Sequence, residues 1–290
     1  MKKYLLTFAD ARMSAAAQRL ARQAGRLGVY DGILACSEVD LRADFVAQFR
    51  ARLDPAARGF GYWCWKPQVI LQALDGLAEG DVLQYTDSGC HLNEKGRARL
   101  HEYFSMAARS ETGLLVFQAI PPSFHDGRPL LDLRERKWAK ADLLAHFGFL
   151  DDQAVLESQQ IGAGVIFVRK CRRSQEIIRE WLGVYEMDFS LGDDTPSRIP
   201  DLPGFVEHRH DQSIFSLLCK KHGVAGISSY EYWYPRRGKF RPDWNALKAY
   251  PVHARRDRGL AGWKRVWNLL QRLGNRLRGG ASKTLLSWHD

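Results

Sequence analysis

The chain has 290 residues, of which 45% are hydrophobic and 26% charged, a composition typical of globular proteins with a well-formed core. This composition excludes a disordered tail protein, a collagen-like fibre and a disulfide-stapled miniprotein. The net charge is +10, but residues 251–290 alone carry +7, which argues against a protein that binds nucleic acid over its whole folded body.

The first third of the chain predicts strands that alternate with helices. Strands are expected at residues 3–9, 32–36 and 81–87, and helices at residues 14–28, 41–53 and 68–77. Ser14 is the expected cap of the first helix, and Pro67 opens the third. This alternation predicts an α/β fold with a mostly parallel sheet and helices on both faces. Because ligands bind beyond the carboxyl ends of such strands, Asp10 and Asp87 are candidate site residues.

The rest of the chain is less regular. Strands are expected at residues 114–119 and 161–168, and helices at residues 136–147, 174–185 and 211–222. Residues 192–204 are rich in Asp, Pro and Gly, and a loop of this length is typically functional or mobile. Asp193 and Asp194 in this loop are expected to be solvated, with contact to an acceptor substrate as the alternative. We expect one domain over residues 1–255 and a tail over residues 256–290.

Several familiar signatures are absent from the sequence. It contains no P-loop, no G-x-G-x-x-G after a strand, no H-E-x-x-H and no G-x-S-x-G motif, which argues against kinases, Rossmann dehydrogenases, zinc proteases and α/β-hydrolases. Five scattered cysteines without a C-x-x-C pair favour a reducing compartment. The apolar run behind Lys2 and Lys3 ends at Asp10, too short for a signal peptide, so a cytoplasmic location is expected.

The segment from Tyr85 to His91 places polar side chains at the end of an apolar strand. Asp87 directly follows the strand, and Gly89 lets the backbone turn sharply or approach a ligand. A carboxylate in this position can bind Mg²⁺ or Mn²⁺, which also coordinate phosphate oxygens. The alternative is that Asp87 begins an Asx-turn and caps the next element.

The segment from Gly61 to Pro67 combines three aromatic residues and one lysine at a helix start. A helix N-terminus and the ammonium group of Lys66 together suit a diphosphate. Tyr62, Trp63 and Trp65 offer flat surfaces for a base or a sugar ring. The alternative is an aromatic core with Lys66 extended to solvent.

A basic loop with flanking aromatic residues follows near the end of the domain. Its cations are Arg236, Arg237 and Lys239. They could bind a diphosphate leaving group or an anionic acceptor such as a phosphorylated glycolipid. An ordinary solvated basic loop explains them equally well.

Five segments, in this order and spacing, resemble the GT-A type of nucleotide-sugar glycosyltransferase, especially bacterial enzymes of surface-polysaccharide and lipopolysaccharide assembly. The segments are residues 4–10, 61–67, 86–89, 158–168 and 210–213. The resemblance covers about residues 3–255 and implies a hexosyltransferase-like enzyme. Such an enzyme moves a sugar from a nucleotide-diphosphate donor to a hydroxyl of a saccharide or glycolipid acceptor.

The resemblance also implies roles for individual residues. Asp211, with Gln212 beside it, would lie next to the reacting sugar and act as general base on the acceptor hydroxyl or orient it. Capping of the following helix explains Asp211 as well. Gln160 would bind the donor sugar by a hydrogen bond. The expected donor-binding residues are Thr7, Asp10, Trp65, Lys66, Asp87, Ser88 and Gln160.

The chain departs from the family at the metal motif. The family has Asp-x-Asp, whereas this chain reads Asp87-Ser88-Gly89 and lacks the second carboxylate. Two alternatives stay open. Either Asp87 binds Mn²⁺ or Mg²⁺ with His253 as a late ligand, or the enzyme is independent of metal. His253 itself is either that late ligand or a surface histidine.

The tail shows a helical period of its own. Leu260, Trp263, Trp267 and other apolar residues fall on one face, with basic residues mostly on the other. Residues 260–278 therefore predict an amphipathic helix that binds an anionic membrane surface, which would place the enzyme on the inner face of the membrane. The alternative is a helix packed back on the domain.

Two rival functions remain. A basic nucleic-acid-binding protein is suggested by the pI of about 9.5 and nine tryptophans, and a non-catalytic carbohydrate- or nucleotide-binding protein by the missing second Asp. Saturable binding of UDP or GDP favours the enzyme, whereas salt-sensitive binding of any polyanion favours the nucleic-acid-binding protein.

Overall fold

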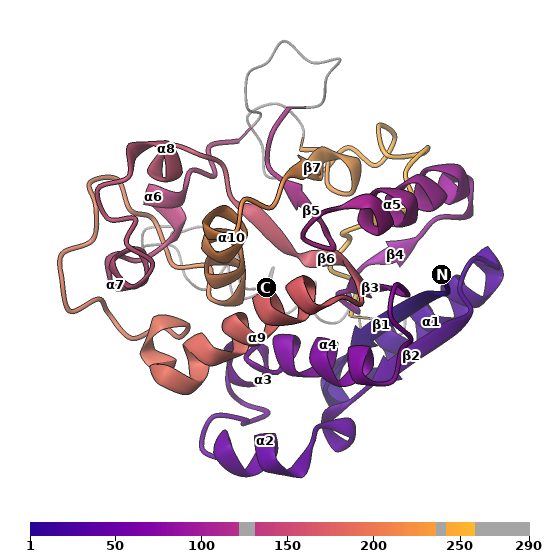
Figure 1. Ribbon diagram of the computed structural model, residues 1–290, viewed down its shortest axis with the longest axis horizontal. Helices are drawn as coiled ribbons and strands as arrows, with labels where there is room; N and C mark the ends of the chain where they lie inside the picture. Colours follow the sequence, from indigo (N-terminus) through magenta and orange to yellow (C-terminus); the bar gives the residue numbers. More distant parts are fainter. Residues whose placement is uncertain (122–130, 236–241, 259–290) are drawn as a thin grey trace, which may run out of the picture.

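The computed structural model describes residues 1–121, 131–235 and 242–258 (Figure 1). Arg236, Arg237 and Lys239 of the predicted basic loop lie outside the described residues, as does the predicted tail helix over residues 260–278. Within the described ranges, no helix combines the length and apolar character needed to cross a membrane.

A six-stranded mixed sheet with the order β2-β1-β3-β6-β5-β7 forms the centre of the structure. Its strands are β1 (Lys3–Phe8), β2 (Gly32–Cys36), β3 (Val82–Thr86), β5 (Leu114–Gln118), β6 (Ile161–Arg169) and β7 (Gly226–Ser228). Strand β1 pairs in parallel with β2 and β3, and β5 pairs in parallel with β7. Only β6 runs against its neighbours β3 and β5. The predicted α/β fold with a mostly parallel sheet is confirmed.

The burial of the strands explains why the sequence shows them clearly. All five residues of β3, in the middle of the sheet, are buried, and its neighbour β6 is an almost continuous apolar run over residues 161–168, as is typical of buried strands. The edge strand β2 alternates between half-buried and exposed positions. A separate pair of short strands, β4 (His91–Leu92) and β8 (Val252–His253), joins the segment behind β3 to the end of the described chain.

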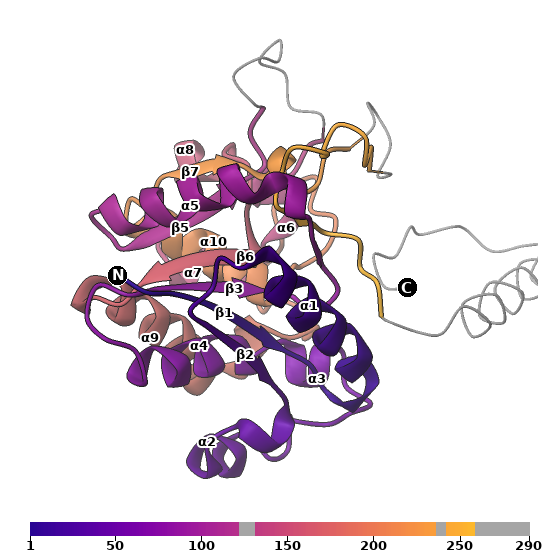
Figure 2. The ribbon, with the colours of Figure 1, turned by 90° about the vertical axis from the view of Figure 1, so that its right-hand side faces the viewer.

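Helices cover both faces of the sheet. They are α1 (Ser14–Leu27), α2 (Ala43–Gln48), α3 (Gly59–Tyr62), α4 (Trp65–Asp75), α5 (Arg97–Arg109), α6 (Glu135–Trp138), α7 (Ala141–His146), α8 (Gln153–Leu156), α9 (Arg172–Met187) and α10 (Asp211–Lys221). Figure 2 shows the sheet between α5 on one side and α4 and α9 on the other. Neighbouring residues of β1 point into different cores, since Leu6 packs with α4, α9 and α10 and Leu5 with α1 and α5.

Some boundaries differ from those predicted. Asp10, not Ser14, is the cap at the first turn: its carboxylate accepts a hydrogen bond from the Met13 N–H (3.1 Å), and Ser14 is already helical. The helix predicted over residues 41–53 is limited to α2. The helix predicted over residues 136–147 is broken into α6 and α7, because Ala139 and Lys140 are extended.

The break has a tertiary cause. The ammonium group of Lys140 donates hydrogen bonds to the carbonyl oxygens of Ser190, Asp193 and Thr195. These carbonyls belong to the region around the predicted irregular loop, and residues 192–204 indeed contain no helix or strand. The backbone at Lys140 is therefore extended, because its side chain binds the loop, although the local sequence pattern favours a helix.

Candidate functional site

Asp87 lies directly behind β3, at the carboxyl edge of the sheet. Its N–H donates a hydrogen bond to the carbonyl of Gly164 in the antiparallel strand β6 (2.9 Å). A Cβ at position 164 would lie only 2.9 Å from Oδ2 of Asp87, so glycine is needed there for the carboxylate to lie over β6. The Tyr85 hydroxyl donates to the other oxygen, Oδ1, at 2.7 Å. Both neighbours therefore fix the orientation of this carboxylate.

Lys66 lies in the first turn of α4 and connects two carboxylates. Its Nζ is 2.5 Å from Oδ2 of Asp211, 3.3 Å from Oδ1 of Asp87 and 3.3 Å from the carbonyl oxygen of Ala163. The residue is only 2% exposed, so it is not the solvent-directed lysine of the alternative interpretation. Because an ammonium group has three protons, these contacts use all of them. Lys66 is thus held by groups of the protein itself, and its binding of a diphosphate stays a prediction from the sequence.

Asp211 is the first residue of α10 and is buried. Burial raises the pKa of its carboxyl group to about 6, although the ammonium group of Lys66 acts in the opposite direction. Burial also lowers the pKa of Lys66, but the carboxylates of Asp211 and Asp87 outweigh it, and the net shift is upward. The Asp87 side chain is 42% exposed, so the Asp87–Lys66–Asp211 cluster opens to solvent at Asp87.

Residues with a strained backbone lie close in sequence to Lys66 and Asp211 of the Asp87–Lys66–Asp211 cluster. Among the described non-glycine residues, those with positive φ are Phe60, Tyr62, Trp63, His210 and Arg256. Three of them come shortly before Lys66, and His210 directly precedes Asp211. Left-handed conformations cost about 1–3 kcal/mol per non-glycine residue and are typical of functional sites. No sequence pattern identified these positions in advance.

His210 links Asp211 to the long loop. Its Nε2 lies 2.9 Å from Oδ1 of Asp194, and Arg58 binds the same oxygen at 3.0 Å. The hydrogen bond from His210 is the main cause that lowers the pKa of Asp194. The neighbouring Asp193 is buried, which corrects the expectation of a solvated side chain there.

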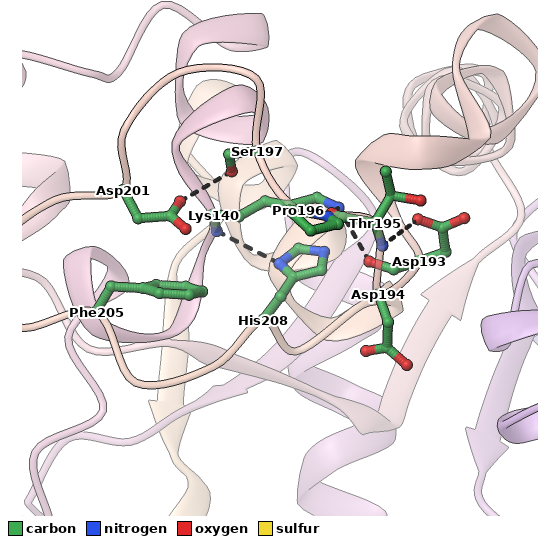
Figure 3. Close-up of a pocket in the computed structure, with 9 residues that line it drawn as sticks. All are labelled: Lys140, Asp193, Asp194, Thr195, Pro196, Ser197, Asp201, Phe205 and His208. Atoms are coloured by element: carbon green, nitrogen blue, oxygen red, sulfur yellow. Dashed lines mark hydrogen bonds between the residues drawn. The ribbon is translucent and has the colours of Figure 1, made fainter.

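A pocket of about 130 Å³ opens beside Asp194 (Figure 3). It is lined by Lys140, Asp193, Asp194, Thr195, Pro196, Ser197, Asp201, Phe205 and His208. Most of these side chains carry oxygen or nitrogen atoms, a lining that suits a ligand rich in hydroxyl groups. Asp194 connects the pocket to His210, which directly precedes Asp211 in the chain.

Three of the predicted donor-binding residues are covered by other parts of the protein. Thr7 in β1 is fully buried, and Trp65 stacks on Phe8 with the ring centroids 4.0 Å apart. Trp65 is thus a core residue, the alternative that the sequence had left open. Ser88 is also buried, and its carbonyl accepts a hydrogen bond from Arg19 (2.9 Å). The structure supports no direct contact of these three side chains with a donor.

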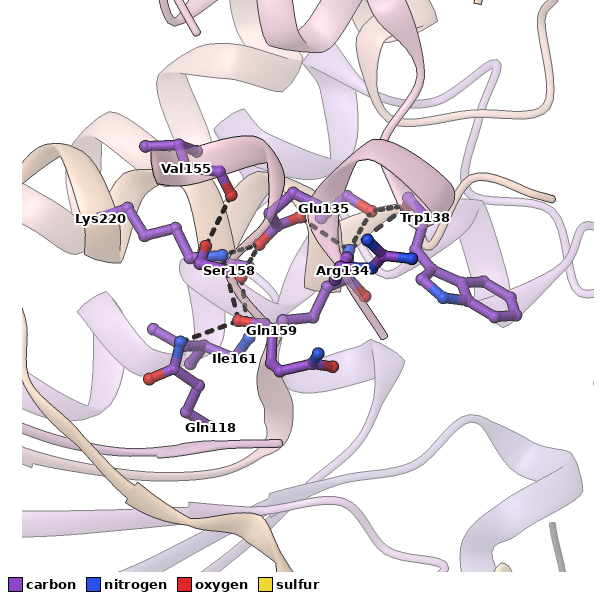
Figure 4. A network of polar contacts seen from close by, with 12 residues as sticks. Gln118, Arg134, Glu135, Trp138, Val155, Ser158, Gln159, Ile161 and Lys220 are labelled. Atoms are coloured by element: carbon purple, nitrogen blue, oxygen red, sulfur yellow. Dashed lines mark hydrogen bonds and ion pairs between the residues drawn. The ribbon is translucent and has the colours of Figure 1, made fainter. Parts of the chain in front are cut away.

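Gln160 is buried in a polar network behind the site. Its amide nitrogen donates to Glu135 (3.0 Å), and its amide oxygen accepts from Gln212 (2.8 Å). Glu135 is fully buried and also pairs with Lys220 (Figure 4), a pair that the sequence did not indicate. Gln160 is therefore placed to hold Gln212 rather than to reach a donor sugar. Asp10 is likewise engaged locally, with Arg12 and the Met13 N–H.

The predicted metal ligands do not form a metal site. His253 is buried, its Nε2 lies 2.8 Å from the Leu247 carbonyl, and its ring is near Trp244, so it is neither a surface residue nor bound to Asp87. In the part of the chain that the structure describes, no three His, Cys, Asp or Glu side chains are arranged to hold a metal ion. Oδ1 of Asp87 is already bound by Lys66 and Tyr85. This donor set does not fit a divalent cation.

The chain matches no protein-family model and no curated protein by sequence. Solved structures are similar to it, among them three glycosyltransferases. A glycosyltransferase involved in the glycosylation of the major capsid of PBCV-1 shares 11% identity over 93% of this chain and 100% of its own, with a TM-score of 0.43. Mouse xyloside xylosyltransferase 1 shares 12% identity over 87% of this chain and 97% of its own, with a TM-score of 0.46. The galactosyltransferase LgtC, in complex with donor and acceptor sugar analogues, shares 13% identity over 93% of this chain and 95% of its own, with a TM-score of 0.43. The chain is thus similar to glycosyltransferases, at identities and TM-scores too low to assign it an activity.

Proposed function

We propose that this protein is a glycosyltransferase that moves a sugar from a nucleotide-diphosphate donor to a hydroxyl of a saccharide or glycolipid in surface-polysaccharide assembly. One observation carries the proposal: Asp87 and Asp211, which are far apart in the sequence, both bind Lys66 at the carboxyl edge of the sheet. Ligands bind at this edge in open α/β sheets. The order of the five resembling segments supports the same reaction.

Asp211 is the proposed general base. Transfer requires that the acceptor oxygen attack the anomeric carbon, lose its proton, and displace the diphosphate, which leaves with the bonding electron pair. A carboxylate with a pKa of about 6 is ionised at neutral pH and is basic enough to accept that proton in the transition state. Lys66 positions Asp211 and keeps it ionised. The exposed side of Asp87 is available for the hydroxyl groups of the donor sugar.

The pocket beside Asp194 is the proposed acceptor site. Its polar lining and its link to Asp211 through His210 support this placement. Binding of phosphate by Arg236, Arg237 and Lys239 stays a prediction from the sequence. The same holds for residues 260–278 of the tail, which we propose to hold the enzyme at an anionic membrane surface because of their charge and helical period.

A panel of UDP- and GDP-sugars tests the proposal. We expect one nucleotide to raise the Tm in a saturable manner, and its sugar to be transferred to a short saccharide. Saturable nucleotide binding without transfer to any acceptor would support the non-catalytic alternative. Salt-sensitive binding of all polyanions, with no saturable nucleotide binding, would support the nucleic-acid-binding alternative.

The pKa of Asp211 predicts the pH dependence of transfer. Burial raises this pKa from its ordinary value to about 6, so the base is protonated and inactive below that pH. We expect log kcat/KM to rise with a slope of about one up to about pH 6 and then to level off. Initial rates at constant ionic strength measure this profile. A rate that stays constant down to about pH 5 would contradict the role of Asp211 as base.

A further inference from the structure

The last described residues form a strap over the turn that follows β3. The Asp257 N–H donates a hydrogen bond to the carbonyl of Gly89 (2.9 Å). Arg19 in α1 ties the two segments together, because its guanidinium group binds the carbonyl oxygens of Asp257 (3.0 Å), Ser88 (2.9 Å) and Cys90 (3.1 Å). In Figure 2 the yellow end of the described chain passes beside α1. The strap, residues 254–258, is thus fixed to the site.

The strap places the backbone of Arg256 over the turn that follows Asp87. Arg256 has a φ of 52°, a left-handed conformation that is rare for a residue with a side chain. Arg256 is an exposed residue, but desolvation of its guanidinium group lowers the pKa, and the carboxylate of Asp87 is the main charge that opposes this shift. A strained backbone beside the turn that follows a site carboxylate is typical of a functional position.

The strap also accounts for the missing second carboxylate. A Cβ at position 89 would lie 3.2 Å from the Cα of Arg256, tighter than an ordinary contact, so a side chain there would push the strap away. In the resembling family this position carries the second Asp of the metal motif. In this chain position 89 is a glycine, and the backbone of Arg256 lies over it.

We propose that Arg256 binds the diphosphate of the donor and that binding and transfer need no divalent cation. This inference rests on the proposed function. The guanidinium group is planar, permanently charged and able to bind phosphate oxygens with two parallel hydrogen bonds. When the bond between the anomeric carbon and the diphosphate oxygen breaks, the electron pair stays on that oxygen, and Arg256 balances its charge. The acceptor oxygen forms the new bond, and its proton passes to Asp211.

Calorimetric titration of the full chain with UDP and GDP, after treatment with EDTA, tests the inference. We expect one of them to bind without metal, and Mn²⁺ to leave the affinity unchanged. Arg256→Ala should weaken this binding about 10- to 100-fold, the range for loss of a charged hydrogen bond, and Arg256→Lys should restore part of it. The corresponding nucleoside, which has no phosphate, should bind Arg256→Ala and the wild-type chain equally.

Arg255→Ala is the matched control, since Arg255 is the neighbouring arginine in the strap and lies over the ring of Trp244. It should bind the nucleotide like the wild-type chain, and the Tm of all variants should confirm that they fold. Nucleotide binding that needs Mn²⁺, or an Arg256→Ala variant that binds as tightly as the wild type, would overturn the inference and leave the proposed function standing. Absence of UDP and GDP binding even with Mn²⁺ would overturn both.

Discussion

Asp211→Asn is expected to lower kcat/KM for sugar transfer by about 10²- to 10⁴-fold, the usual contribution of a general base. The substitution keeps the shape of the side chain and removes only its charge. Lys66 retains Asp87 and the Ala163 carbonyl as partners, so the folded structure should persist. Nucleotide affinity should stay close to that of the wild type, because the loss concerns proton transfer. Steady-state kinetics and calorimetric titration measure the two effects separately.

Asp152→Asn is the matched control for this variant. Asp152 also lies at a helix N-terminus, where its carboxylate accepts a hydrogen bond from the Val155 N–H, and it is exposed and outside the site. Asparagine caps a helix about as well as aspartate, so the control should retain full activity. If Asp211→Asn retains most of its activity, or loses it only together with its Tm, Asp211 is not the base.

Lys66→Met is expected to reduce the free energy of unfolding by about 3–5 kcal/mol at neutral pH, because it leaves the buried Asp211 carboxylate without its cation. Without Lys66 the pKa of Asp211 should rise further. A group whose pKa is raised in the folded state stabilises that state at low pH and loses this contribution as the pH rises through the folded-state value. The deficit of Lys66→Met should therefore shrink as the pH falls from the raised pKa of Asp211 in the variant to about 6, its value in the wild-type chain, and stay constant below that pH. Urea unfolding at several pH values measures it.

Two further variants test whether the loss of stability comes from breaking the buried Lys66–Asp211 pair or simply from removing a positive charge. Lys221→Met removes a lysine that is 47% exposed and paired with Glu180, and this should cost at most about 1 kcal/mol. Lys66→Met combined with Asp211→Asn should be more stable at neutral pH than Lys66→Met alone, since the unpaired charge is gone. A Lys66→Met deficit that is small, or equal at all pH values, would show that the buried ion pair does not hold the site together.

The amino-acid sequence by itself determined the strands, their alternation with helices and the position of Asp87. Residues 161–168 form an apolar run because most of β6 is buried in the middle of the sheet, and burial of this kind can be read from local composition. The position of Asp87 at the carboxyl end of β3 can also be read from the local sequence. The order of the sheet, with β6 antiparallel between β3 and β5, required pairings between distant segments.

Only the tertiary structure decided what the polar residues do. The sequence around Lys66 is compatible with a phosphate ligand, and its real partner Asp211 lies 145 residues away. The break at Lys140 is caused by carbonyls of a loop more than 50 residues further along. The sequence showed that position 89 lacks the carboxylate of the resembling family, but the reason is the backbone of Arg256, which folds over it. In each case the deciding interaction joins residues far apart in the chain, and local pattern carries no information about such pairs.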